Sequence, residues 1–160
     1  MTMKIVLASN NRGKLLELQA MLAPLQFELV RQADLGIPEA EEPFRTFVEN
    51  ALTKARHAAR LSGLPALADD AGLCVDAFGA YYATRFGYEK GDANNVRALL
   101  EQMDNVDNRR AAMVSTLVAL RSADDPEPLI AVGRVQGEIT RAPRGAGGFG
   151  FDPVMFVPGL

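Results

Sequence analysis

Hydrophobic and polar positions follow two spacings along the chain, and these spacings predict its first strands and helix. Residues 4–8 form a short, apolar, β-branched run that is typical of a buried strand, and polar residues end it from Ser9 onward. Apolar side chains then recur at helical spacing over residues 15–22, and Pro24 closes that helix. Residues 27–30 can return as a second strand. The N-terminal part therefore predicts a strand, a helix and a strand.

A longer helix is predicted between Phe44 and Ser62, where apolar residues keep the spacing i, i+3, i+4 for more than three turns. The Ser62-Gly63 pair ends it, as glycine commonly does at a helix C-terminus. Its stripe is rich in alanine, which permits close packing on a sheet. The stripe contains Phe47, Val48, Ala51, Leu52, Ala55, Ala58 and Ala59.

The remaining chain predicts four further strands and one helix. The strands are expected at residues 66–68, 73–77, 111–120 and 129–139, the helix at 94–103, and a hairpin connection at 122–127. Helices separate the early strands, whereas the late strands follow one another directly. This order predicts an α/β fold with a mixed central sheet flanked by helices.

Composition narrows the class of protein. The chain has 160 residues, 48% of them hydrophobic, and a net charge of −3, which fits one globular domain. Its 17 Lys and Arg against 20 Asp and Glu leave no basic excess, so nucleic-acid binding is not expected. No apolar run is long enough to span a membrane, and residues 1–8 lack the form of a signal peptide. We expect a cytoplasmic protein whose single cysteine, Cys74, is a buried structural thiol.

The loop after the first predicted strand is a candidate phosphate site. Backbone N–H groups at a helix N-terminus attract anions, Gly13 allows close approach, and Lys14 adds a positive charge. The loop lacks the spacing of a P-loop. An ordinary polar turn between a strand and a helix explains the same residues.

Two acidic pairs are candidate metal ligands. Glu41 and Glu42 precede the long helix, where acidic residues also favour the helix dipole. Asp69 and Asp70 stand between apolar strands, where adjacent charges repel and lose hydration unless a cation compensates. Mg²⁺ takes oxygen ligands, usually one or two carboxylates, and shares substrate phosphates. The Asp pair therefore predicts a magnesium site.

Two further features have both a structural and a functional interpretation. Lys54 on the long helix is either solvated or a phosphate ligand, and the nearby His57 is expected on the helix surface. The glycine-rich segment 145–153 carries Phe149 and Phe151, a composition suited to a planar base. A turn with core phenylalanines is the alternative interpretation.

Four segments in this order resemble the inosine triphosphate pyrophosphatase family. They are Ala8-Ser9-Asn10-Asn11-Arg12-Gly13-Lys14; the Glu41-Glu42 pair with Phe47-Val48-Glu49-Asn50-Ala51 and Lys54; Ala68-Asp69-Asp70-Ala71-Gly72-Leu73; and Gly147-Gly148-Phe149-Gly150-Phe151-Asp152-Pro153. The resemblance covers nearly the whole chain.

The resemblance implies a fold and a reaction. It implies an elongated α/β fold with a central cleft, Mg²⁺ dependence, a homodimer, and hydrolysis of (d)ITP or XTP to the monophosphate and pyrophosphate. Ser9, Asn11, Lys14 and Lys54 would contact the triphosphate, and Ala71 would lie beside the substrate. Glu41 or Glu42 would hold the metal with Asp70, beside Asp69, and Asp70 would also be the base. Phe149, Gly150, Phe151 and Asp152 would meet the purine.

The chain departs from the family pattern in three places. Ala71 stands where relatives usually have Ser, and segment 77–82 is shorter than the usual loop. Relatives also continue beyond Leu160 into a lysine, a Ser-His-Arg motif and a terminal helix. We therefore expect residues 1–160 to form a single pyrophosphatase domain without that C-terminal segment, as a truncated protein or as the ordered part of a longer chain. The alternatives are a Maf-type nucleotide pyrophosphatase and a nucleotide-binding module without turnover.

Overall fold

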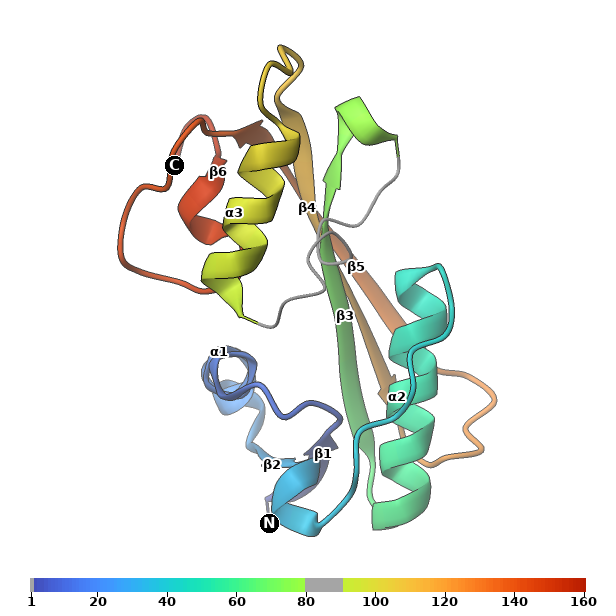
Figure 1. Ribbon diagram of the computed structural model, residues 1–160. Helices are drawn as coiled ribbons and strands as arrows, with labels where there is room; N and C mark the ends of the chain where they lie inside the picture. The colour runs from blue at the N-terminus through green and yellow to red at the C-terminus, as the bar shows by residue number, and fades with distance from the viewer. Residues whose placement is uncertain (1, 80–90) are drawn as a thin grey trace. The chain divides into compact units, whose positions relative to one another are not determined.

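The computed structural model describes residues 2–79 and 91–160 and shows an α/β fold (Figure 1). In the described residues the strands are β1 (Met3–Leu7), β2 (Phe27–Arg31), β3 (Ala66–Val75), β4 (Arg110–Leu120), β5 (Leu129–Ile139) and β6 (Met155–Phe156), and the α-helices are α1 (Arg12–Leu22), α2 (Phe47–Ser62) and α3 (Asp92–Gln102). The strands form a sheet in the order β2-β1-β3-β4-β5-β6. Strand β1 pairs in parallel with β2 and β3, and β5 pairs antiparallel with β6. The predicted α/β class and mixed sheet are confirmed.

The chain divides into two compact units. The first contains Met1–Asp70 and Ser115–Val132, and the second contains Ala71–Val114 and Gly133–Leu160. Strands β3, β4 and β5 contribute residues to both. None of the helices in the described residues is long and apolar enough to cross a membrane.

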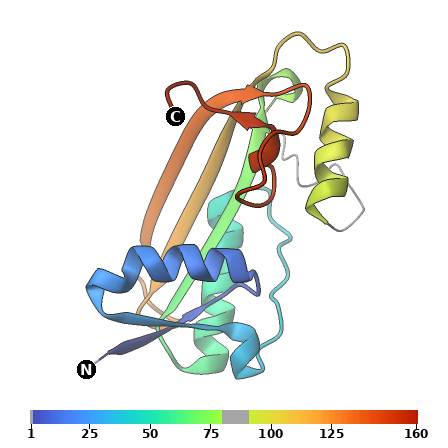
Figure 2. The same ribbon diagram turned by 90° about the vertical axis from the view of Figure 1, so that its left-hand side faces the viewer.

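Unit 1 buries apolar side chains on both faces of its sheet. Along β1, Val6 belongs to one core cluster and Leu7 to another, as expected where successive side chains point to opposite faces. The first cluster includes the alanine stripe of α2, and the second is covered by leucines of α1. Figure 2 shows α1 running alongside β2. Helices α1 and α2 therefore cover opposite faces of this sheet.

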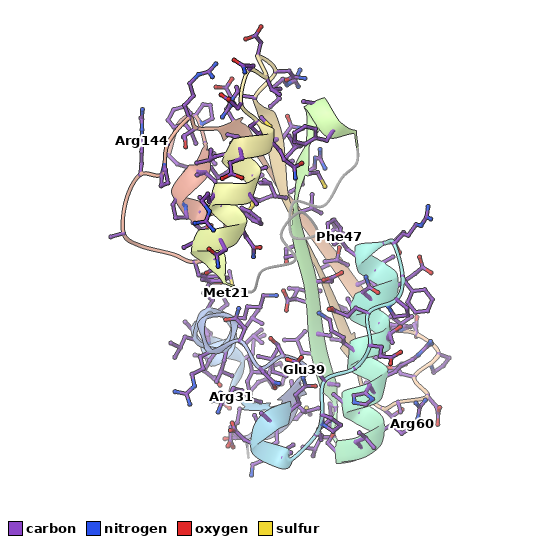
Figure 3. The ribbon with its side chains drawn as sticks, viewed as in Figure 1. Met21, Arg31, Glu39, Phe47, Arg60 and Arg144 are labelled. Carbon is purple, nitrogen blue, oxygen red and sulfur yellow. The ribbon has the colours of Figure 1, made fainter. Side chains whose placement is uncertain are left out.

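Helix α2 begins and ends with strong local signals. The Thr46 hydroxyl caps the helix, because it accepts a hydrogen bond from the Glu49 N–H at 3.3 Å. The same hydroxyl donates to the Glu49 carboxylate at 2.6 Å. Gly63 ends the helix with a φ of +69°, a conformation that glycine adopts without a Cβ penalty. Figure 3 labels Phe47 and Arg60 at the two ends of α2. The predicted end of the long helix is confirmed.

Unit 2 has its own core, in which α3 packs with β-strand residues and the C-terminal segment. Leu73, Leu99, Met103 and Val154 are fully buried there. Arg109 joins the parts of this unit, because its guanidinium donates to the carbonyls of Met103, Ile139 and Thr140 at 2.8–3.0 Å. One side chain thus satisfies backbone acceptors at the end of α3 and at the end of β5.

Replacing Arg109 with Met is expected to lower the free energy of unfolding by about 2–4 kcal/mol. The change leaves three part-buried carbonyl groups without their donor. Urea denaturation of wild-type and variant protein measures the difference. Arg110→Met is the matched control, because the Arg110 side chain is 70% exposed and contacts Asp76 only at 3.7 Å. Equal losses in both variants would show that Arg109 does not join the unit.

Candidate functional site

The loop between β1 and α1 is held in one shape by its own polar side chains. The Asn11 N–H donates to the Ser9 hydroxyl at 3.1 Å, and the Asn11 side-chain oxygen accepts from the Lys14 N–H at 3.2 Å. Asn11 is therefore the N-cap of α1, and the helix begins at Arg12. The predicted strand, loop and helix are confirmed at this position.

A pocket of about 190 Å³ opens beside this loop, within unit 1. Four of its lining residues are sequence-predicted site residues: Ser9, Asn11, Glu42 and Lys54. Its other lining residues are Ala8, Asn10, Gln32, Glu39 and Ala40. The pocket walls are thus rich in amide, hydroxyl, carboxylate and ammonium groups.

The sheet topology explains why these residues meet. Strands β1 and β2 run parallel to each other, and β1 runs parallel to the start of β3, so β1 and β2 end at the same edge, beside the Asp pair of β3. The carboxyl ends of parallel strands are where α/β proteins bind ligands. Gln32 follows the end of β2 and is 3% exposed, although nothing in the local sequence distinguishes it. The Asn10 amide donates to Glu39 at 3.0 Å, and Figure 3 labels Glu39 in the segment before α2. The sequence signal that could have identified Gln32 is its position directly after a predicted parallel strand, because ligands bind at the carboxyl ends of such strands.

The two adjacent aspartates lie within one strand, which corrects the prediction of two strands flanking them. Strand β3 runs unbroken through Asp69 and Asp70. Leu67 packs in the α1-side cluster and Ala68 in the α2-side cluster, so alternation directs Asp69 toward α1 and Asp70 toward α2. The carboxylates therefore do not face each other, and no break in the strand is needed to separate them.

Each aspartate is neutralised by a lysine from the helix on its own face. The Lys14 ammonium of α1 lies 2.8 Å from Asp69, whose side chain is only 7% exposed. The Lys54 ammonium of α2 lies 3.8 Å from Asp70 and 2.8 Å from Glu42. Pairing with an opposite charge offsets part of the cost of burying each carboxylate.

Asp70 has the electrostatics of a proton acceptor. Burial raises the pKa of its carboxyl, and the negative charge of Glu42 raises it further, whereas Lys54 and a hydrogen bond from Asn50 partly offset these effects. Asn50 also fixes the preceding segment, because its amide group exchanges two 3.0 Å hydrogen bonds with the Phe44 backbone. Asn50 is therefore a site residue to which the sequence analysis gave no role of its own.

Several other predicted residues lie apart from the pocket. Glu41 is exposed and does not line it, and Ala71 is half-buried in unit 2. His57 contacts the Pro38 carbonyl at 2.8 Å, which makes its Nε2 the donor and gives it a structural contact. Cys74 is half-buried, and burial raises the pKa of its thiol. Segment 77–82 lies partly outside the described residues.

The predicted base-binding segment forms a tight loop in unit 2. Phe151 is 5% exposed and packs in the core of that unit, whereas Phe149 is half-buried and Asp152 is exposed. The Asp152 carboxylate accepts a hydrogen bond from the Phe149 N–H at 3.1 Å. Of the two aromatic rings, that of Phe149 is therefore the more accessible.

Among the described residues, the acidic groups form no large metal cluster. Within residues 2–79 and 91–160, no group of three or more His, Cys, Asp or Glu side chains could hold a metal ion. Glu42 and Asp70 remain as a pair that shares the Lys54 ammonium. One oxygen of the buried Asp69 carboxylate has no hydrogen-bond partner among the residues that the structure describes.

Comparison with known proteins supports the resemblance found in the sequence. The chain is 78% identical over 163 residues to a dITP/XTP pyrophosphatase of Paracidovorax citrulli, with 98% of this chain and 82% of the relative covered. A HAM1 protein from Coxiella burnetii superposes with a TM-score of 0.88 at 41% identity, over 98% of this chain and 82% of that one. A nucleoside-triphosphatase / dITP/XTP pyrophosphatase from Mycobacterium abscessus matches with a TM-score of 0.76 at 38% identity, over 99% and 85%. The family model matches residues 5–160, and the chain belongs to the Ham1 family.

Proposed function

We propose that this protein hydrolyses the non-canonical purine nucleoside triphosphates dITP, ITP and XTP to the monophosphate and pyrophosphate. Relatives named dITP/XTP pyrophosphatase, up to 78% identical to the chain, support the substrate class. The observation that carries the proposal is the arrangement around β3. Two lysines and a carboxyl with a raised pKa lie along β3, just past the point where the parallel strands β1 and β2 end.

The lysines suit a triphosphate. Phosphoryl transfer depends on positioning and on neutralising the charge that develops on phosphate oxygens. Lys14 and Lys54 each supply a largely buried ammonium group, and the α1 N-terminus supplies backbone N–H groups beside Ser9 and Asn11. We assign the binding of the triphosphate to these residues.

Asp70 is the proposed general base. In the reaction the oxygen of a water molecule bonds to the α-phosphorus, and the bond from that phosphorus to the α–β bridging oxygen breaks. Pyrophosphate leaves with the bonding electrons, and Asp70 accepts the proton of the water. A carboxylate with a raised pKa holds that proton better than an ordinary one, which favours its transfer.

The donor set around Lys54 also fits a magnesium ion. Mg²⁺ in phosphate-processing sites is held by one or two carboxylates, and Glu42 and Asp70 both approach the same ammonium group. We assign these two residues as its ligands and Asp69 as the partner of Lys14 rather than a ligand. Glu41 is exposed outside the pocket and is the weaker candidate. When bound, the ion would supply further neutralisation of the phosphate charge.

We assign recognition of the purine to the loop of Phe149, Gly150 and Asp152. The accessible Phe149 ring offers a stacking surface, and the polar groups of the turn offer hydrogen bonds. The buried Phe151 would anchor the loop rather than touch the base. Ala71 provides no hydroxyl for the substrate.

The resemblance also supports a homodimer and a cytoplasmic location. Nucleoside triphosphates are consumed by polymerases in the cytoplasm of bacteria, so a hydrolase that removes non-canonical ones acts on the same pool. Light scattering of the purified protein measures its mass in solution. A mass of twice 17.3 kDa is the expected result, and a mass of 17.3 kDa at all concentrations would reject the dimer.

Pyrophosphate release from ITP, XTP, GTP and ATP, measured with Mg²⁺ and with EDTA, tests the function. We expect release from ITP and XTP that exceeds release from GTP and ATP and that EDTA abolishes. Preference for other nucleotides would favour a Maf-type specificity. Binding of ITP without release would favour a nucleotide-binding module.

A further inference from the structure

Two carboxylates hold the backbone of the glycine loop, which we define as residues 147–152. The Phe149 N–H donates to Asp152 at 3.1 Å, and the Gly150 N–H donates to Asp92 at 2.8 Å. These two N–H groups belong to the peptide bonds on either side of Phe149. The two peptide planes that flank Phe149 set the direction of its side chain, and each of them is therefore held by its own carboxylate.

The two carboxylates reach the loop from different places. Asp152 belongs to the loop itself, and it turns back so closely that a Cβ at Gly148 would collide with its carboxylate. Asp92 is the first residue of α3 and lies 58 positions away in the chain. Asp152 thus sets the local shape of the loop, whereas Asp92 ties its tip to a separate element.

The Asp92 carboxylate is free to serve the loop because α3 does not use it as a cap. The N-cap of α3 is Gly91, which offers no side-chain oxygen, and an acidic residue in the first turn favours the helix dipole in any case. A hydrogen bond from an N–H to an ionised carboxylate is shorter and stronger than a neutral one. Phe151 docks the same loop in the core beside Val96 and Leu99 of α3. Asp92 and Phe151 therefore hold the loop on α3 at two points.

We propose that Asp92 is a positioning residue for base recognition, which orients the Phe149 ring by fixing the Gly150 peptide. This inference rests on the proposed function, because it assigns the ring to the purine of the substrate. Asp92 is exposed, so its contact with the loop contributes little to the fold as a whole. Its loss should change how the base is bound more than it changes stability.

Asp92→Ala is expected to raise KM for ITP by about tenfold and to change kcat by less than about twofold. Binding of inosine monophosphate should weaken by a similar factor in calorimetry, a measurement that needs no turnover. Asp92→Asn keeps an oxygen that can accept from Gly150, and it should recover most of the affinity. Asp107→Ala removes an exposed carboxylate of the same unit that lies in the turn after α3, and it should behave as wild type.

The outcomes separate this inference from the function on which it rests. If the wild-type protein releases no pyrophosphate, the proposed function is rejected. The affinity of wild type and Asp92→Ala for inosine monophosphate still tests the role of Asp92 in that case. Unchanged affinity and KM in Asp92→Ala would overturn the inference. An equal loss of kcat for all nucleotides with a lower melting temperature would also overturn it, because that pattern indicates a structural role. If the Ala variant does not fold, wild-type affinity in Asp92→Leu, which keeps the approximate size of the side chain but has no acceptor for the Gly150 N–H, would also overturn the inference.

Discussion

Asp70→Asn should lower kcat for ITP by about 10²- to 10⁴-fold, the usual contribution of a general base. The amide keeps the shape of the side chain and cannot accept the proton of the attacking water. The substitution also removes one of the two carboxylates assigned to the metal. The fold should persist, because Lys54 keeps its contact with Glu42 at 2.8 Å. Steady-state pyrophosphate release, with circular dichroism as a check on folding, measures the effect.

Asp124→Asn is the matched control, because Asp124 is an exposed carboxylate of the same unit and lies outside the pocket. Retained turnover in Asp70→Asn would reject the assignment of the base. A pH profile adds an independent test. Because burial raises the pKa of Asp70, the acidic limb of kcat/KM should lie above pH 3.8, with activity lost as the pH falls and the carboxylate is protonated. An acidic limb at or below that value would contradict the assignment.

Lys54→Met should lower kcat/KM for ITP by about 10²- to 10³-fold, which is typical for the loss of one group that stabilises a developing oxyanion. The Lys54 side chain is 14% exposed, and its ammonium group contacts both Glu42 and Asp70, so its removal leaves two carboxylates without their shared cation. Their repulsion should raise the pKa of Asp70 further and shift the acidic limb of the profile upward. The measurement is kcat/KM as a function of pH.

Arg56→Met provides the comparison for Lys54, because it also removes a cation from α2 but at an exposed position. Wild-type kcat/KM is expected for that variant. Lys54→Arg keeps the charge with a different shape, so partial activity would indicate that charge dominates. A Lys54→Met enzyme with an unchanged profile would place the lysine outside the reaction.

The sequence predicted the elements of unit 1 because its signals are local. Pro24 and Gly63 mark where helices end, and the spacing of alanines marks the buried face of α2. The sequence could also have predicted that Asp69 and Asp70 point to opposite faces of the sheet. Strict alternation along a strand directs neighbours to opposite faces, but the prediction ended one strand at Ala68 and began the next at Leu73, so it did not apply alternation to the Asp pair.

Other site features depend on contacts between distant segments, which no local pattern records. Gln32 reaches the pocket only because β2 runs parallel to β1, and nothing in its own neighbourhood indicates a ligand role. Asp92 contacts the glycine loop across 58 positions of the chain. Phe149 and Phe151 stand two positions apart in a loop, where no regular period tells the accessible ring from the buried one. These assignments need the tertiary structure.

The alanine stripe of α2 has a consequence for how the protein can evolve. Ala51, Ala55 and Ala58 are 0% exposed, so the helix axis rests as near to the sheet as side chains permit. Lys54 is attached to that same helix, one position before Ala55. A larger residue in the stripe would lift the helix and carry the ammonium group away from the strand that bears Asp70. The small size of these alanines therefore sets the distance between Lys54 and Asp70, although the alanines themselves contact no nucleotide. Selection for catalytic activity then acts on these positions as well.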